Sequence, residues 1–307
     1  MPEIREVGVE NMEQVARLWN AGFPLRPTDA EEMGRALGYE PHLRPRYWLA
    51  WQEDSPIGLG ILEPNIGSYH PLKWLAFVTV DLSYRRQGLG QRLWETLLSA
   101  IPEPPISIQS GVTEDDEPSL RFASRRGFEE VKRDFESELD LGTTASLVAP
   151  DVDCITFATL EEMDSPAFRR QMHALFEVVR ADIPRPDPPT PLTFEFYESE
   201  VIAHPKIVRN ATVIGMQGEE IAGFSTVYQG AQDGYLDQGL TAVRRESRGK
   251  GLAQALKVRC INRAREAGYR AIRTDNDTRN APMLAINDKL GFKRLKGTIT
   301  MQWEPRS

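Results

Sequence analysis

The hydrophobic and polar positions of the chain follow one order of periodicities twice. Apolar residues at helical spacing predict helices, and alternating or short apolar runs bounded by turn residues predict strands. In each half these patterns give the order β-α-β-β-β-α-β-α-β. The predicted elements of the first half include residues 4–7, 10–20, 47–51, 57–62, 74–80, a helix from 89, 106–112 and 130–141. Those of the second include 155–157, 166–179, 211–216, 221–228, 235–243, a helix from 252, 271–275 and 298–303.

Two short motifs recur at nearly the same spacing. The first is Arg85-Arg86-Gln87-Gly88-Leu89-Gly90, and 163 residues later Arg248-Gly249-Lys250-Gly251-Leu252-Ala253. The second is Arg126-Gly127-Phe128, and 164 residues later Leu290-Gly291-Phe292. Two anchors at nearly one spacing indicate an internal repeat. We therefore expect an α/β protein of mixed α+β type with tandem domains at residues 1–143 and 151–307, joined by a linker at 142–150.

The bulk composition limits the classes of partner. A chain of 307 residues with 40% apolar and 27% charged residues suits two soluble domains. The net charge of −8 argues against a nucleic-acid partner, which a basic face would bind. Two cysteines are too few for a disulfide framework or a zinc site, so no metal is expected. The sequence predicts no membrane span and no secretory signal, hence a cytoplasmic protein.

The repeated glycine turn is the strongest chemical signal in the sequence. It follows a predicted strand and opens a predicted helix, where unpaired N–H groups and the helix dipole favour a phosphate. It matches neither the dinucleotide fingerprint nor the P-loop. We expect the N–H groups from Gln87 to Gly90, and from Lys250 to Ala253, to face a pyrophosphate. The alternative interpretation is an ordinary strand-to-helix turn with glycine for geometry. The basic residues expected to supply countercharge are Arg85, Arg86, Arg248 and Lys250.

The order of elements and these motifs resemble the GNAT superfamily of acyl-CoA-dependent N-acetyltransferases in its tandem form. The resemblance covers nearly the whole chain and implies, in each copy, a mixed and mostly antiparallel sheet flanked by helices. It implies that the turn, including Gly249, Gly251, Leu252 and Leu89, binds the pyrophosphate of CoA. It also implies that the preceding strand pairs with the pantetheine arm, through Val78 and Val80 or through Thr241 and Val243. The family's CoA-contacting Asn is Asn280 in the second copy, whereas the first copy has Asp116.

The resemblance also locates the catalytic groups. Many members carry a Tyr as general acid four residues before the Gly of Gly-Phe, but here that position holds Asn287 or Ala123. A thiol pKa near 8.5 lets the thiolate leave without that acid. A carboxylate base occurs in some members eleven residues before the turn, which is Asp237 in the second copy and Trp74 in the first. The N–H near Val243 would polarise the thioester. Asp275 and Asp277 are the alternatives to Asp237 as base or amine binder.

These features predict an N-acyltransferase, with acetyl as the expected acyl group. A primary amine of a small molecule or peptide would attack acyl-CoA directly in a ternary complex. The second domain is predicted to carry the chemistry, and the first to be a degenerate copy that shapes the substrate cleft. The two proline-rich stretches at 22–45 and 182–191 differ between the copies, so they predict either specificity loops or simple connectors. The alternative function is a non-catalytic acyl-CoA-binding or assembly protein, and an oligomer is possible.

Overall fold

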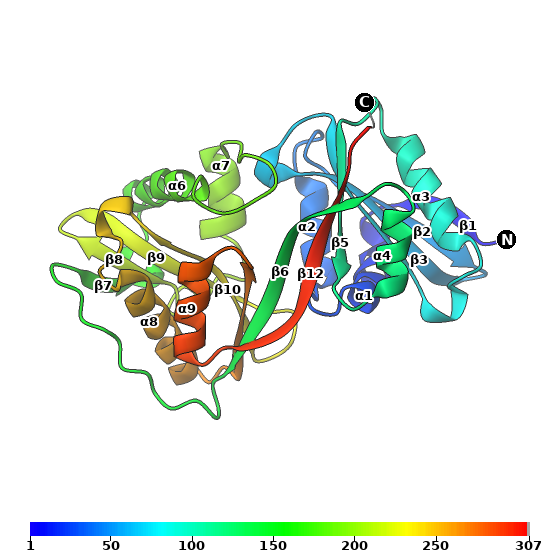
Figure 1. Cartoon of the computed structure of the whole chain (residues 1–307). Helices are drawn as coiled ribbons and strands as arrows, with labels where there is room; N and C mark the ends of the chain where they lie inside the picture. The colour runs from blue at the N-terminus through cyan, green and yellow to red at the C-terminus, as the bar shows by residue number, and fades with distance from the viewer. Residues whose placement is uncertain (306–307) are drawn as a thin grey trace. The chain divides into compact units, whose positions relative to one another are not determined.

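The computed structural model describes residues 1–305, and these form two compact units. Unit 1 contains Met1–Asp134 and the chain from Lys296 on, and unit 2 contains Phe135–Leu295. Each unit is a mixed sheet flanked by helices (Figure 1), which is the predicted fold class.

In unit 1 the strand order is β1-β2-β3-β4-β5-β12. β4 and β5 are parallel, and the neighbours β1/β2, β2/β3, β3/β4 and β5/β12 are antiparallel. The strands are β1 (Glu3–Val7), β2 (Arg46–Gln52), β3 (Ser55–Pro64), β4 (Lys73–Val80), β5 (Ser107–Thr113) and β12 (Lys293–Trp303). The helices are α1 (Met12–Gly22), α2 (Ala30–Arg35), α3 (Leu89–Ala100) and α4 (Glu117–Ser124).

Unit 2 repeats this order as β7-β8-β9-β10-β11-β6. β10 and β11 are parallel, whereas β7/β8, β8/β9 and β9/β10 are antiparallel. The strands are β7 (Thr156–Thr159), β8 (Val213–Gln217), β9 (Glu220–Gln229), β10 (Tyr235–Val243), β11 (Ala271–Asp277) and β6 (Glu129–Asp140). The helices are α5 (Leu160–Met163), α6 (Pro166–Arg180), α7 (Phe194–Tyr197), α8 (Leu252–Glu266) and α9 (Ala281–Leu290).

The two units exchange their last strands. The chain leaves unit 1 within β6, between Asp134 and Phe135, and returns to it within β12, between Leu295 and Lys296. Residues 142–150, the expected linker, lie in unit 2, where Asn262 of α8 exchanges hydrogen bonds of 2.7 and 3.2 Å with the backbone of Leu147. The domain ranges 1–143 and 151–307 follow the sequence repeat and stay a prediction.

Alternation along the strands divides the core of each unit between two faces of its sheet. In unit 1, Leu59 and Ile61 of β3 pack with α1, while Leu62 of the same strand packs with α3. In unit 2, Phe224 packs with α6 and Val227 packs with α8. The short helix α2 lies within the proline-rich stretch 22–45, and the short helix α7 follows the stretch 182–191. The Asp29 and Thr193 side chains cap the first N–H groups of these two helices. Within residues 1–305, no helix has both the length and the hydropathy to cross a membrane.

Candidate functional site

The sheet of each unit opens at one rung. In unit 1 the parallel pairing of β4 with β5 ends at Leu75 and Gln109, and in unit 2 that of β10 with β11 ends at Asp237 and Arg273. Beyond these pairs the strands separate, so one edge of β4 and one edge of β10 face open space. An extended ligand can pair with a strand edge of this kind.

Two backbone hydrogen bonds show which groups face that open edge. The N–H of Asp81 donates to Ile57 of β3 at 2.9 Å, and the N–H of Arg244 donates to Ala222 of β9 at 2.8 Å. Because successive N–H groups of a strand point to opposite edges, those of Val80 and Val243 point to the open edge. By the same alternation, the N–H groups of Val78 and Thr241 point there too. The predicted pantetheine-binding residues therefore have the required orientation in both units.

The two glycine turns have the same geometry. Gly88 and Gly251 precede the helices α3 and α8 with φ of 82° and 81°, a left-handed conformation that favours glycine. Within residues 1–305, no side chain caps either helix, and a Cβ built on either glycine would meet no atom within 4 Å. The first N–H groups of α3, at Leu89 and Gly90, and of α8, at Leu252 and Ala253, are thus accessible to an anion.

The first arginine of each motif supports the turn. The Nε of Arg85 donates to the Val80 carbonyl at 2.9 Å, and the Nε of Arg248 donates to the Val243 carbonyl at 3.0 Å. Within each motif Arg86 has a φ of 64°, and its counterpart Gly249 has 75°. The Arg85 and Arg248 side chains therefore tie the strand to the turn in addition to bringing positive charge.

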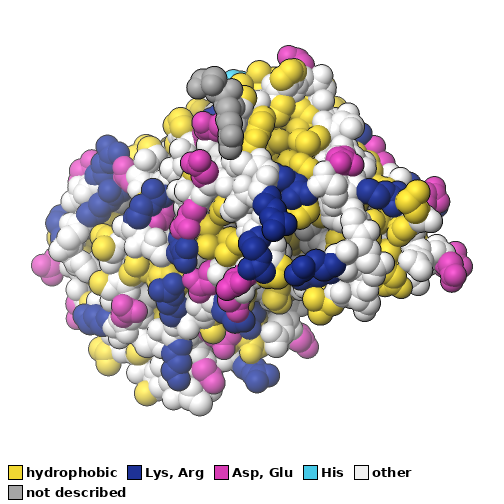
Figure 2. Space-filling view, turned by 45° about the vertical axis from the view of Figure 1, so that its right-hand side comes forward, with side chains coloured by type: hydrophobic (Ala, Val, Ile, Leu, Met, Phe, Trp, Pro, Cys, Tyr) yellow, Lys and Arg dark blue, Asp and Glu magenta, His cyan; other side chains and the backbone are white. Residues whose placement is uncertain are grey.

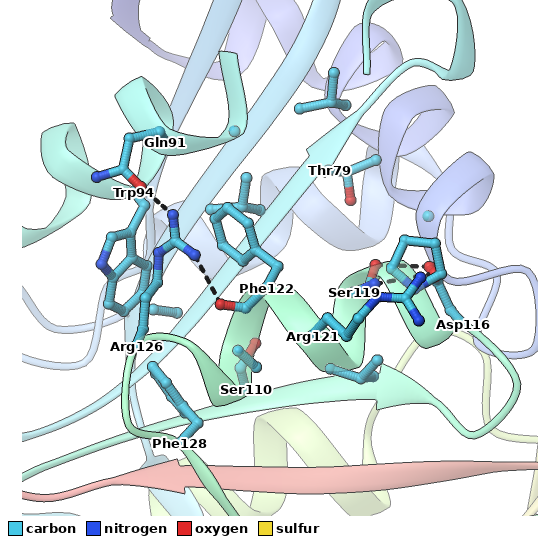
Figure 3. A pocket seen from close by; sticks show the side chains of 18 of the residues that line it. Thr79, Gln91, Trp94, Ser110, Asp116, Ser119, Arg121, Phe122, Arg126 and Phe128 are labelled. Atoms are coloured by element: carbon cyan, nitrogen blue, oxygen red, sulfur yellow. Dashed lines mark hydrogen bonds between the residues drawn. The ribbon is translucent and has the colours of Figure 1, made fainter. Parts of the chain in front are cut away.

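A cavity of about 840 Å³ lies at the opened edge of β4 in unit 1 (Figure 3). It passes through the sheet, because Trp94 and Phe122 line it from the α3–α4 face while Phe23 and Thr79 line it from the α1 face. The turn residues Arg85, Arg86, Gly88 and Gly90 line it, and so do Arg121, Arg125 and Arg126. Figure 2 shows basic side chains gathered beside exposed hydrophobic atoms on the face in view.

Arg126 is fixed over one wall of this cavity. Its guanidinium lies 3.3 Å from the ring centroid of Phe122, donates to the Phe122 carbonyl at 2.7 Å and also donates to Gln91 (Figure 3). In the sequence, Arg126 stands out only as part of the repeated Arg126-Gly127-Phe128 motif, and Trp94 only as part of the predicted helix from 89. Their convergence with Phe122 on one cavity has no local sequence signal.

The corresponding positions of unit 2 hold polar side chains. The registers and the repeat spacings pair four cavity-lining residues of unit 1, Ala76, Trp94, Val112 and Ala123, with Gln238, Lys257, Asn276 and Asn287 of unit 2. Asn287 donates to Asn276, and Gln238 donates to Ser225 at 2.8 Å. Burial lowers the pKa of the Lys257 amine to about 7. These groups replace the apolar walls of the unit 1 cavity with hydrogen-bonding ones.

The glycine turn of unit 2 also has an acidic partner, which comes from the proline-rich stretch at 182–191. Asp182 accepts from Arg245 at 2.6 Å and from Arg248 at 2.5 Å. These hydrogen bonds hold the pKa of the Asp182 carboxyl at about 2. The countercharge predicted for Arg248 is therefore shared with a carboxylate, and nothing in the sequence next to Asp182 indicates this pairing. Lys250 donates to the Glu246 carbonyl at 3.1 Å.

Asp116 and Asn280 occupy one structural position, the N-cap of the helix after the opened strands. Asp116 accepts from the Ser119 N–H at 3.1 Å, and Asn280 accepts from the Met283 N–H at 3.4 Å. The Asp116 carboxylate also lies 4.0 Å from Arg85, which offsets its charge beside an anionic ligand. Ala123 and Asn287, at the expected general-acid position, are both buried.

The residue of unit 1 that corresponds to Asp237 differs from the one predicted from the sequence. Counting back from the turn gave Trp74, but the parallel registers pair Asp237 with Arg273 and Leu75 with Gln109, so the counterpart is Leu75. A register shift between Gln238 and Thr241 adds one residue to β10, whereas β4 pairs continuously with β3.

The surroundings of Asp237 in unit 2 suit a base. Its side chain is exposed, yet nearby protein atoms desolvate the carboxyl and raise its pKa, against the opposing effect of Arg273. Asp277 is buried and paired with Arg279 at 2.7 Å, which suits a structural role. Asp275 lies close enough to Asp237 to raise its pKa further.

Comparison with known proteins agrees with this geometry. The model of the acetyltransferase (GNAT) family matches residues 12–128 and again 172–292. A GCN5-related N-acetyltransferase from Sphaerobacter thermophilus shares 18% identity at a TM-score of 0.76, over 100% of this chain and 96% of its own. A tandem GNAT protein from the clavulanic acid biosynthesis pathway shares 19% at 0.76, over 100% of both chains. No curated protein matches this sequence. The chain belongs to the GNAT acetyltransferase family, whose domain it contains twice.

Proposed function

We propose that this protein is an acyl-CoA-dependent N-acyltransferase whose acyl-CoA binds in the cavity of unit 1. The cavity of about 840 Å³ at the opened edge of β4 is the observation that carries the proposal. This volume lies within the range of about 300–1,000 Å³ that is usual for small-molecule and cofactor sites. Its apolar walls suit a pantetheine arm, and its arginines and the uncapped start of α3 suit the phosphates.

The residues present fit acetyl-CoA at each part of the ligand. The N–H groups of Val78 and Val80 would pair with the amides of the arm, and those of Leu89 and Gly90 would bind the pyrophosphate. An N–H aimed at the thioester oxygen stabilises the developing charge by about 3 kcal/mol. The acceptor is a primary amine of a small molecule or peptide, which attacks the thioester directly in a ternary complex.

Unit 2 remains the second candidate, favoured by the sequence. Its turn, Arg248 to Ala253, has the geometry of the first, Thr241 and Val243 present N–H groups to the open edge, and Asp237 has a raised pKa. Against it stand the polar side chains around Lys257 and the pairing of Arg248 with Asp182. A non-catalytic acyl-CoA-binding protein is the alternative from another functional class, since both units have lost the general-acid Tyr.

Steady-state release of free CoA tests the activity. With acetyl-CoA and a panel of primary amines, we expect amine-dependent CoA release and the matching N-acetyl product by mass spectrometry. Acetyl-CoA at a hundredfold excess over its Kd should also stabilise the protein by about 2.7 kcal/mol. Stabilisation without CoA release for any amine would favour the binding protein. If acetyl-CoA neither stabilises the protein nor gives CoA release with any amine, the proposal is contradicted.

A further inference from the structure

Each unit carries one carboxylate at the rung where its sheet opens, but on different strands. In unit 2 the rung consists of Tyr228 on β9 and Asp237 on β10, and Asp237 in turn pairs with β11. In unit 1 the same rung consists of Glu63 on β3 and Leu75 on β4, and Leu75 in turn pairs with β5. Directly opposed residues on neighbouring antiparallel strands lie about 5 Å apart at their Cβ atoms. The carboxylate of unit 1 therefore lies at the same rung as that of unit 2, but on the neighbouring strand.

We propose that Glu63 is the general base of unit 1, the group that takes the proton from the attacking amine. The inference rests on the proposed function, because it assigns a role in amine acylation at the same cavity. It adds a residue that counting from the turn could not find, since that spacing leads along β4 and Glu63 is on β3.

Glu63 lies on the face from which an amine would approach. Alternation along β3 places it with Leu59 and Ile61, which pack with α1, and its carboxyl influences Tyr47 of that same cluster. The α3–α4 face carries the turn and the arginines. The cavity reaches the α1 face, where Phe23 and Thr79 line it. A thioester held between the opened strands would thus have CoA on one face and Glu63 on the other.

The surroundings of Glu63 suit a base. Its side chain is half-buried, and desolvation raises the pKa of the carboxyl from 4.5 to about 7. The titratable groups beside it are Tyr47 on β2, which interacts with it electrostatically, and Lys73, which alternation places on the same face of β4 as Leu75. The Tyr47 hydroxyl donates to the Met33 carbonyl at 3.2 Å, so its proton is directed away from the carboxylate. A base of this pKa is matched to proton transfer at neutral pH.

The proposed step balances protons and bonds. Ionised Glu63 takes one proton from the ammonium, directly or through water, and later releases it to solvent. The neutral amine forms a C–N bond to the carbonyl carbon as the C–S bond breaks, and CoA leaves as the thiolate. The second proton, lost from the new amide nitrogen, passes to that thiolate.

Glu63→Gln tests the role, with Asp237→Asn as the matched variant of unit 2. Both changes keep the shape of the side chain. With the amine that gives the fastest CoA release, we expect kcat of Glu63→Gln to fall by about 100-fold or more, while acetyl-CoA affinity measured by calorimetry stays within twofold of the wild type. The wild-type rate should rise with pH through about 7, and this limb should be lost in Glu63→Gln and kept in Asp237→Asn.

The outcomes separate this inference from the proposed function. Retained turnover with an unmoved acidic limb in Glu63→Gln would overturn the role of Glu63 while leaving the transferase intact. Loss of the limb in Asp237→Asn alone would overturn it in favour of unit 2. If the wild type releases no CoA with any amine, the proposed function fails. If acetyl-CoA affinity also falls in Glu63→Gln, Glu63→Asp decides: recovery of turnover with the limb supports the base, and recovery of affinity without turnover contradicts it.

Discussion

The two units share a backbone design and differ in what lines it. In both units the two parallel strands separate after their third residue pair, and N–H groups of the longer strand point to the open edge. In both, the next helix has a glycine as its N-cap residue and therefore no side-chain cap. Unit 1 surrounds that opening with apolar walls and arginines, whereas unit 2 fills the matching positions with Gln238, Lys257 and Asn287. We propose that these walls, rather than the shared motif, determine which unit binds acyl-CoA.

A buried lysine marks the change in unit 2. Lys257 is 1% exposed, and its ammonium nitrogen lies 5.1 Å from the Phe292 ring, where unit 1 packs Trp94 on Phe128. A charge in such a site is costly, so burial favours the neutral amine and lowers the pKa of Lys257.

Lys257→Met should give the largest effect and sharpen the contrast. The pKa of Lys257 falls from 10.5 to about 7 on folding, so the folded state binds fewer protons between these values. Unfolding free energy of the wild type should therefore rise with pH from about 7 to 10.5, by roughly 4 kcal/mol. The Met variant should be more stable at pH 7, by up to that amount, and lack the slope. Urea unfolding across this pH range checks it, and an unchanged slope would show that Lys257 is not desolvated.

Gly88→Asp should weaken acetyl-CoA binding by about 100-fold, and Gly251→Asp by less than threefold. An aspartate at the N-cap would itself accept from the first N–H groups of α3 and place a negative charge against the pyrophosphate. Gly88→Asn is the matched control, because asparagine tolerates the left-handed backbone and carries no charge. Calorimetric titration of all three variants measures this. Loss of binding in Gly251→Asp alone would place the ligand in unit 2.

Much of the frame could be predicted from the sequence because its signals are local. The turn at Gly88 and Gly251, and the N-cap position shared by Asp116 and Asn280, each depend on a few consecutive residues. The strand exchange could not be predicted, because the residue patterns of β6 and β12 predict a strand without indicating which unit's sheet it joins.

The two carboxylates proposed as bases show the limit of counting along the chain. One extra residue in β10, between Gln238 and Thr241, moved the counterpart of Asp237 from Trp74 to Leu75. Glu63 became visible only when the strand pairing placed it across from Leu75. Likewise, Asp182 reaches Arg248 across 66 positions of sequence, and only the fold brings the two together.

Amide hydrogen exchange of the unmodified protein, with and without acetyl-CoA, tests the central claim most directly. Bound pyrophosphate would accept hydrogen bonds from the N–H groups at the start of one helix and slow their exchange. The account predicts protection of residues 86–92 and 76–81 in unit 1, with little change at 249–255 and 239–244 in unit 2. Protection confined to 249–255 and 239–244 would contradict it and return the acyl-CoA site to the second copy.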